Sequence, residues 1–296
     1  MLQMRFLSKN IVLSAVSMLI LSAAAILASD LIRPGRDRAP GPRPAGSIRI
    51  ATLNINGLRP LGDAAVSAEC LRTMLLESDV DIAFLQEFLL WGGLDEDGFR
   101  DVFNDLYPYV AIQGDEAIVS RFPIVSRCQH GFEGSDNSYS SNDVAVSPSD
   151  TVRFFNAHLQ TTGLHSIQSV LAREKAAGGY GIPGEAEVSV MKGNTKARKY
   201  QAVKVRRDVD GSPYPAVLCG DLNSVPRSWV YRRVKGGMRD TFREKGRGLG
   251  ATFRGAHGIL RIDYVFHDGS FRCIGHSTVE SSVSDHRMVV ATLMPR

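Results

Sequence analysis

Short apolar runs rich in β-branched residues recur along the chain from residue 48 onward. Each run is bounded by residues typical of turns, which is the pattern of strands buried within a sheet. We expect strands at residues 48–54, 80–86, 117–120, 152–159, 216–219, 262–266 and 288–293.

Helical spacing appears between several of these runs. The segment 61–78 carries apolar residues on one side, namely Ala65, Ala68, Leu71, Leu75 and Leu76, and residues 196–207 mix Ala, Val and basic residues at the same spacing. Residues 131–150 and 177–194 are rich in Gly, Ser and Asn, so we expect loops there. The alternation predicts an α/β fold with two groups of strands.

The N-terminus holds an uncharged apolar segment, residues 11–28, preceded by Arg5 and Lys9. Its length is at the lower limit for crossing a bilayer and slightly long for a signal-peptide core. We expect residues 1–32 to be an uncleaved single-span anchor or a cleaved signal peptide. A buried globular helix is disfavoured, because only three serines interrupt the run.

Residues 33–46 contain four prolines and three glycines and predict an extended, semi-rigid spacer before a globular domain at 47–296. Four arginines in this segment compete with the two basic residues before the apolar run, so the positive-inside rule fixes the orientation weakly. We favour a membrane-anchored or exported protein whose domain lies outside the cytoplasm.

Composition is that of an ordinary globular protein, with 296 residues and 44% hydrophobic side chains. The net charge of +4 comes from residues 1–46, since the remaining chain holds 29 basic and 29 acidic residues. Residues 47–171 carry 7 basic and 17 acidic side chains, whereas residues 172–296 carry 22 and 12. This asymmetry reflects either solvated or mutually attracting surfaces, or a positive face that attracts a phosphate-bearing substrate.

The four cysteines are too sparse for a disulfide framework and lack the spacing of a zinc site: Cys70, Cys128, Cys219 and Cys273. We expect buried free thiols, while one disulfide stays possible if the domain is exported.

Polar residues stand at or near the strand ends: Asn54, Glu87, Asn156, His158, Asp221, Asn223, Asp263, Asp285 and His286. Singly, each fits a turn, a helix cap or a satisfied core side chain. Together they predict a shared rim, where burying several carboxylates costs several kcal/mol each unless a cation compensates. Oxygen ligands such as Glu87 and Asp285, with no cysteine nearby, favour Mg²⁺, with Mn²⁺ or Ca²⁺ as alternatives.

These motifs, in the order TLNING, LQE, IVSRFPI, NAHLQTT, CGDLNSVP, RIDYVF and SDHRMVV, resemble the endonuclease/exonuclease/phosphatase superfamily over residues 47–296. The resemblance implies a four-layer α/β/β/α sandwich of two mixed sheets with helices outside, here preceded by an N-terminal apolar helix. It places the site at one end of the sandwich.

By motif position, the resemblance makes Glu87 the main metal ligand, with Asn54 beside it and Asp285 at the same or a neighbouring cation site. Asn156 is assigned to substrate binding. In the nuclease branches a further carboxylate steadies a histidine, and here the stretch SYSSNDVAV offers only Asp143.

The catalytic assignments implied by the resemblance are His158, Asp221, Asn223, Asp263 and His286. Asp221, assisted by Asn223, would orient or deprotonate the attacking water. His286, paired with Asp263, and His158 would hold the phosphate and stabilise its developing charge. An aspartate beside a histidine favours the imidazolium, which suits that role.

The sequence therefore predicts a divalent-metal-dependent phosphoesterase that cleaves a phosphodiester or phosphomonoester by in-line attack of water. We favour a lipid headgroup, inositol phosphate or small molecule as substrate, a membrane contact through residues 11–28 and a monomeric catalytic domain. One alternative is an endonuclease or exonuclease acting on DNA or RNA, for which Arg227, Arg232, Arg233 and Lys235 are candidate phosphate contacts or merely a solvated helix face. Another is an inactive member that binds a ligand or partner.

Overall fold

The computed structural model describes residues 32–163, 185–255 and 258–296. The apolar segment 11–28 lies outside these ranges. Among the described helices, none combines the length and apolarity needed to cross a membrane.

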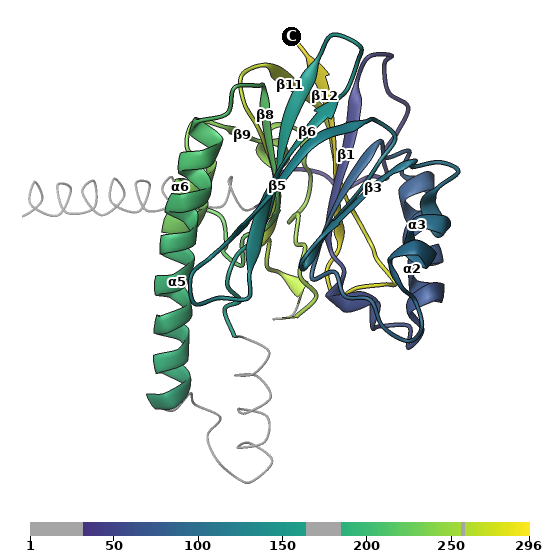
Figure 1. Cartoon of the computed structure of the whole chain (residues 1–296). Coiled ribbons are helices and arrows are strands. Elements are labelled where there is room, and N and C mark those ends of the chain that lie inside the picture. Colours follow the sequence, from purple (N-terminus) through teal and green to yellow (C-terminus); the bar gives the residue numbers. More distant parts are fainter. Residues whose placement is uncertain (1–31, 164–184, 256–257) are drawn as a thin grey trace, which may run out of the picture.

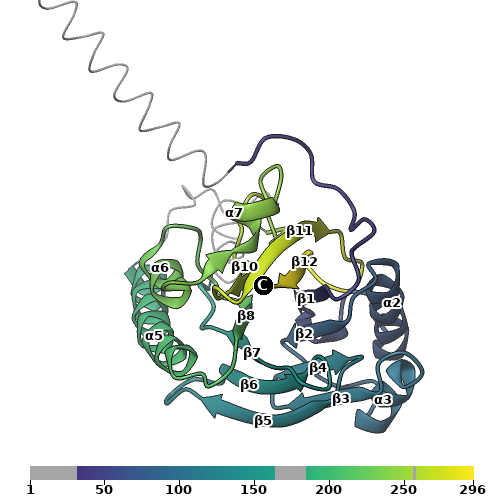
Figure 2. The ribbon, with the colours of Figure 1, turned by 90° about the horizontal axis from the view of Figure 1, so that it is seen from above.

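Two six-stranded sheets pack face to face (Figures 1 and 2). The first has the order β11 (Phe271–Val279), β12 (Met288–Pro295), β1 (Ile48–Asn54), β2 (Ile82–Gln86), β4 (Glu116–Ser120) and β3 (Tyr109–Gln113). The second has the order β5 (Ile124–Gly131), β6 (Ser138–Ala145), β7 (Thr151–His158), β8 (Ala216–Asp221), β10 (Asp263–His267) and β9 (Arg239–Asp240). Each sheet is mixed, because β1 runs parallel to β2 and β7 runs parallel to β8, while the other pairs are antiparallel.

Helices cover the outer face of each sheet, which gives the four layers seen in Figure 2. The first sheet carries α2 (Ala64–Glu77) and α3 (Glu96–Phe103), and the second carries α5 (Glu185–Asp210) and α6 (Trp229–Lys235). The remaining helices in the described part of the chain are short, namely η1 (Asn56–Leu58) and α7 (Thr241–Lys245).

Three hydrophobic layers hold the sandwich together, one between each pair of adjacent layers. Alternate residues of a central strand serve different layers: Val217 and Cys219 of β8 face the first sheet, while Ala216 and Leu218 join the cluster under α5 and α6. Strands buried on both faces need apolar side chains at successive positions. This requirement explains the continuous apolar runs in the sequence.

Two loop predictions are wrong. Residues 131–150 include β6, in which Ser138, Ser140 and Asn142 are buried and hydrogen-bonded. Of residues 177–194, those from 185 onward form the first turns of α5, and the rest lie outside the described residues. The four cysteines are free thiols, but only Cys219 and Cys273 are buried.

Residues 33–46, predicted as a spacer, lie against the domain. Arg33 and Gly248 exchange backbone hydrogen bonds of 2.8 and 2.9 Å. Asp37 accepts a 2.7 Å bond from the Thr278 amide, and Arg43 pairs with Asp79 and Asp81. The segment is therefore held at several points along its length.

Candidate active site

Polar side chains from both sheets meet at one end of the sandwich. Strands β1, β2, β7 and β8 finish at this end, and their antiparallel neighbours β4, β10 and β12 begin there. This topology brings together Asn54, Glu87, His158, Asp221, Asn223, Asp263, Asp285 and His286. His158, Asp221 and Asp263 stand directly side by side in the register of β7, β8 and β10.

Asn156, which we expected to bind substrate, lies between the two sheets and not in this cluster. Its side chain is completely buried, accepting a 2.6 Å hydrogen bond from Gln86 Nε2 and donating a 3.1 Å bond to the Leu85 carbonyl. Gln86 and Leu85 belong to the first sheet and Asn156 to the second. Asn156 therefore joins the two sheets behind the site and presents no surface to a substrate.

The corner after β8 is built around the Asp221 carboxylate. Its Oδ1 accepts a 2.7 Å bond from the Asn223 amide, and Asn223 also donates a 3.0 Å bond from Nδ2 to the Leu159 carbonyl. Asn223 has a φ of 47°, a left-handed conformation that asparagine adopts more readily than most residues. Asn223 therefore both adopts the backbone conformation of this turn and holds the Asp221 carboxylate in place.

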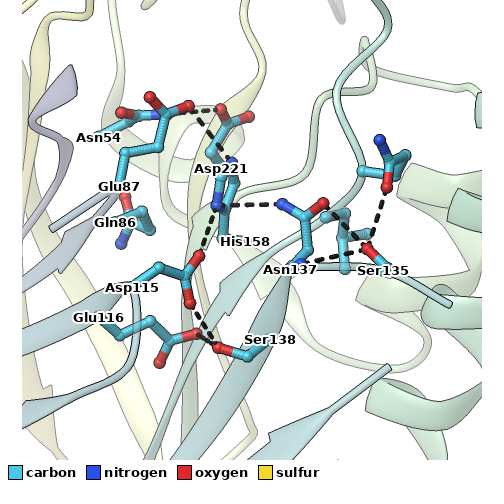
Figure 3. Close-up of polar contacts among 12 residues, drawn as sticks. Asn54, Gln86, Glu87, Asp115, Glu116, Ser135, Asn137, Ser138, His158 and Asp221 are labelled. Atoms are coloured by element: carbon cyan, nitrogen blue, oxygen red, sulfur yellow. Dashed lines mark hydrogen bonds and ion pairs between the residues drawn. The ribbon is translucent and has the colours of Figure 1, made fainter. Parts of the chain in front are cut away.

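Asn54 links the two sheets through the same carboxylate. Its Nδ2 donates a 2.8 Å bond to Glu87 Oε1 and a 3.2 Å bond to Asp221 Oδ2, as Figure 3 shows. Burial and, to a lesser extent, the neighbouring Asp263 carboxylate raise the pKa of Asp221 to about 6. A carboxylate with this pKa can accept a proton near neutral pH.

His286 and Asp263 form a buried ion pair beside Asp221. His286 Nδ1 lies 2.9 Å from Asp263 Oδ2, and its Nε2 lies 3.9 Å from Asp221 Oδ2. Burial lowers the pKa of His286, but the charge and hydrogen bond of Asp263, together with the charges of Asp221 and Asp285, outweigh burial and raise this pKa to about 10. His286 is therefore an imidazolium at neutral pH, with the ring of Phe253 at 5.0 Å.

A second histidine–carboxylate pair joins His158 to Asp115, a residue that the sequence interpretation missed. His158 Nδ1 lies 3.1 Å from Asp115 Oδ2, and its Nε2 lies 3.5 Å from Glu87 Oε1 (Figure 3). Burial lowers the pKa of His158, yet the Asp115 hydrogen bond and nearby negative charges raise it above the usual value. Ser138 Oγ in turn donates a 2.7 Å bond to Asp115 Oδ1.

The prediction that Asp143 steadies a histidine is wrong. Its two carboxylate oxygens accept bonds of 2.6 and 2.8 Å from Arg153, directly opposite on β7. Asp115 immediately precedes β4, so the signal available in the sequence is an acid two residues before the apolar run at 117–120. Proximity to His158 comes only from the pairing of β4 in the first sheet and the packing of the sheets.

A cavity of about 640 Å³ opens over this cluster. Glu87, Asp221, Asp285 and His286 line it together with residues of α5 and α6. The cavity is large enough for a substrate of ordinary small-molecule size.

The family model described as the endonuclease/exonuclease/phosphatase family matches residues 51–286. The chain belongs to this family. No curated protein matches it at a significant level.

Solved structures of this family share the fold at low sequence identity. A Bacteroides thetaiotaomicron endonuclease/exonuclease/phosphatase family protein is 20% identical with a TM-score of 0.60, over 83% of this chain and 97% of that one. A mannosyl-6-phosphatase from the same species is 19% identical with a TM-score of 0.57, over 83% and 99%. Sphingomyelinase C from Streptomyces griseocarneus is 16% identical with a TM-score of 0.51, over 84% and 99%.

The donor set at this family site fits a hard divalent cation. Asp221, Asp263 and His286 place ligand atoms within 4.8 Å of one another, but a charged imidazolium whose Nδ1 faces Asp263 has no lone pair to offer. Glu87 and Asp285 instead present carboxylates to the cavity, and the Glu87 side chain is 43% exposed. Oxygen donors of this kind suit Mg²⁺, Mn²⁺ or Ca²⁺.

Proposed function

We propose that this chain is a divalent-metal-dependent hydrolase that cleaves a phosphoester bond by in-line attack of water. The observation that carries the proposal is the placement of Asp221. Its carboxylate lies between the amides of Asn54 and Asn223 and beside charged His286, and it opens onto the same cavity as Glu87.

In this proposal Asp221 accepts the proton of the attacking water, because it is the cavity carboxylate whose pKa is raised toward neutral pH. Asn54 and Asn223 hold the carboxylate in place by hydrogen bonds, which fixes the direction of attack. His286 donates a hydrogen bond to a non-bridging phosphate oxygen, where negative charge develops.

His158 approaches from the side of Glu87, held by Asp115, and stabilises the same phosphate or the leaving oxygen. Glu87 and Asp285, with Asn54 beside them, would hold the cation, which supplies charge neutralisation at the phosphate oxygens when bound. Asn54 would present its oxygen to the cation only after its amide turns, because the nitrogen now faces both carboxylates.

The inactive alternative is disfavoured, because an acceptor carboxylate, a charged histidine and a second histidine pair all meet at one cavity. For the substrate we favour a lipid headgroup, inositol phosphate or small molecule. Two structural relatives are named as a mannosyl-6-phosphatase and a sphingomyelinase, which are enzymes of this kind. Nucleic acid is the alternative, supported by exposed Arg232 and Arg233 on α6.

We also propose that residues 11–28 tether a monomeric domain at the outer face of a membrane. Protease treatment of intact cells tests the orientation, since an extracytoplasmic domain is digested and a cytoplasmic one is protected. Extraction with carbonate tests the tether, because an exported, cleaved form is released from the membrane fraction.

The substrate is tested by incubating the protein with Mg²⁺ and, separately, plasmid DNA, sphingomyelin and inositol phosphates. We expect turnover of a lipid or inositol phosphate that chelation abolishes. Nicking of DNA at catalytic rates with no turnover of the other two would overturn this preference in favour of a nuclease.

A further inference from the structure

The active-site cavity extends well beyond the reacting groups, to a wall formed by α5 and the start of α6. Thr195, Arg198 and Lys199 of α5 line this wall together with Ser228 and Trp229. The two helices lie side by side on the outer face of the second sheet (Figure 1). The wall therefore belongs to the same cavity as Asp221 but comes from a different layer of the fold.

Arg198 is the unusual residue of this wall. Its side chain is 6% exposed, and Nη1 donates to the carbonyls of Gln160 and Thr161 at 3.1 and 2.9 Å. Nη2 donates to Thr195 Oγ1 at 3.1 Å, while Nε is buried without a partner. All of these acceptors are neutral, so they satisfy hydrogen bonds without neutralising the charge.

The other buried arginines are each paired with a carboxylate. Arg49 lies 3.5 Å from Asp79, Arg206 lies 2.7 Å from Asp210, and Arg261 lies 2.9 Å from Asp240. Arg198 has no carboxylate within 4.0 Å among the residues that the structure describes. Burial holds its pKa below the usual value, and the charge of Asp221, which is beyond ion-pair distance, opposes this shift only in part.

A buried cation with no carboxylate in direct contact is costly to maintain, and an incoming anion reduces that cost. Lys199 adds a second positive charge at the same wall, with its ammonium 5.9 Å from the ring of Trp229. The cavity lining thus includes the acidic residues Glu87 and Asp285 and the basic residues Arg198 and Lys199.

We infer that Arg198 and Lys199 form a second anion subsite, which binds a further phosphate group of the substrate while the scissile phosphate lies between Asp221 and His286. The inference rests on the proposed function and narrows it to small-molecule phosphoesters that carry more than one phosphate. A singly phosphorylated substrate leaves the subsite empty.

Two chromogenic substrates test the second anion subsite directly. They are thymidine 5′-(p-nitrophenyl phosphate) and the same compound with a 3′-phosphate. Both release p-nitrophenol from the same phosphodiester, so they differ only in the second phosphate. With the full-length protein and Mg²⁺ we expect kcat/KM to be about tenfold higher for the 3′-phosphorylated compound, as one or two charge-assisted hydrogen bonds predict.

Lys199→Ala should remove most of this preference while keeping the rate on the simpler substrate. Arg198→Met should remove it as well, and Arg198→Lys should retain part of it, provided that thermal unfolding shows a folded protein. Lys196→Ala is the matched control, because it deletes an exposed charge of the same helix that does not line the cavity.

Equal kcat/KM for the two substrates in the wild type would overturn the inference and leave the proposed hydrolysis standing. Equal loss on both substrates in Lys199→Ala would also overturn it, because these cations would then act on the scissile phosphate. If neither compound is cleaved, hydrolysis of sphingomyelin and inositol phosphates still tests the proposed function, and calorimetric binding of thymidine 3′,5′-bisphosphate against thymidine 5′-phosphate tests the subsite. Tighter binding of the bisphosphate that Lys199→Ala abolishes supports the subsite, and equal binding refutes it.

Discussion

At the scale of single residues, Asp263 determines the pH range over which His286 stays charged. In the proposed mechanism protonated His286 is the active form, so activity is kept below its pKa of about 10 and lost as pH rises through that value. In Asp263→Asn the burial of His286 is no longer opposed by a paired carboxylate, and its pKa falls. We expect the alkaline limb of kcat/KM to move toward neutral pH.

The acidic limb of the pH profile of kcat/KM should also move to lower pH in Asp263→Asn. In the same proposal Asp221 acts in its ionised form, so activity is lost as pH falls through its pKa of about 6. Asp263→Asn removes a neighbouring negative charge and lowers this pKa. A pH profile from about pH 5 to about 10.5 checks both limbs, and an alkaline limb that stays in place would contradict the assignment of His286.

Asp115 and Asp143 give opposite predictions although both are aspartates in the second quarter of the domain. Asp115→Asn should lower kcat about 10- to 100-fold, because His158 loses the carboxylate that orients and charges it. Asp143→Asn should leave kcat unchanged and lower the free energy of unfolding by about 1 kcal/mol, because it breaks only the pair with Arg153. Steady-state kinetics and urea unfolding on both variants separate the two roles, and an activity loss in Asp143→Asn alone would reverse the assignment.

The sequence predicts most residues of this site because they stand at strand ends within recognisable motifs. Asn156 stands in such a motif too, but its amide is used between the sheets, which depends on the contact with Gln86 and Leu85 of the first sheet. Asp115 could not be predicted because its role depends on a contact that is distant in the sequence. Its partner His158 is 43 residues away on the other sheet, so no local pattern connects them.

At the scale of elements, Gly220 permits the parallel pairing of β8 with β7. A Cβ at this position would lie 2.0 Å from the carbonyl oxygen of Ala157, and φ is 133°, so no larger residue fits. Gly220→Ala should lower the free energy of unfolding by about 3 kcal/mol or more. Because β8 carries Asp221, activity should fall with stability.

Gly193→Ala is the control, since a Cβ there meets no atom within 4 Å and the residue lies in α5. We expect it to stabilise the protein by about 0.5–1 kcal/mol. Urea unfolding measures both variants. Similar stabilities for the two would show that the close approach of β7 and β8 is not a constraint.

All seven strands predicted from the sequence are present, as β1, β2, β4, β7, β8, β10 and β12. These are mainly the central strands, whose apolar runs follow from burial on two faces. The others escaped prediction for physical reasons. β5 is an exposed edge strand, β6 buries polar residues that bond to one another, and β11 is interrupted by an irregularity between Cys273 and Gly275.

At the scale of the whole molecule, the docked segment 33–46 contributes to the stability of the domain. Arg43 pairs with Asp79 and with buried Asp81, so Arg43→Ala should lower the free energy of unfolding by about 1–3 kcal/mol. Arg38 of the same segment is exposed, and Arg38→Ala should change the free energy of unfolding by less than about 0.5 kcal/mol. Equal unfolding curves for the two variants would mean that the segment is an independent spacer.

We propose that one cluster from both sheets hydrolyses a phosphoester with the help of a divalent cation. Hydrolysis of bis(p-nitrophenyl) phosphate with Mg²⁺ by the wild type, His286→Ala and Glu87→Gln tests this role of the cluster. We expect rates that fall by about 10²- to 10⁴-fold in both variants and that chelation of the metal abolishes in the wild type. Equal rates in all three proteins would contradict the proposed site.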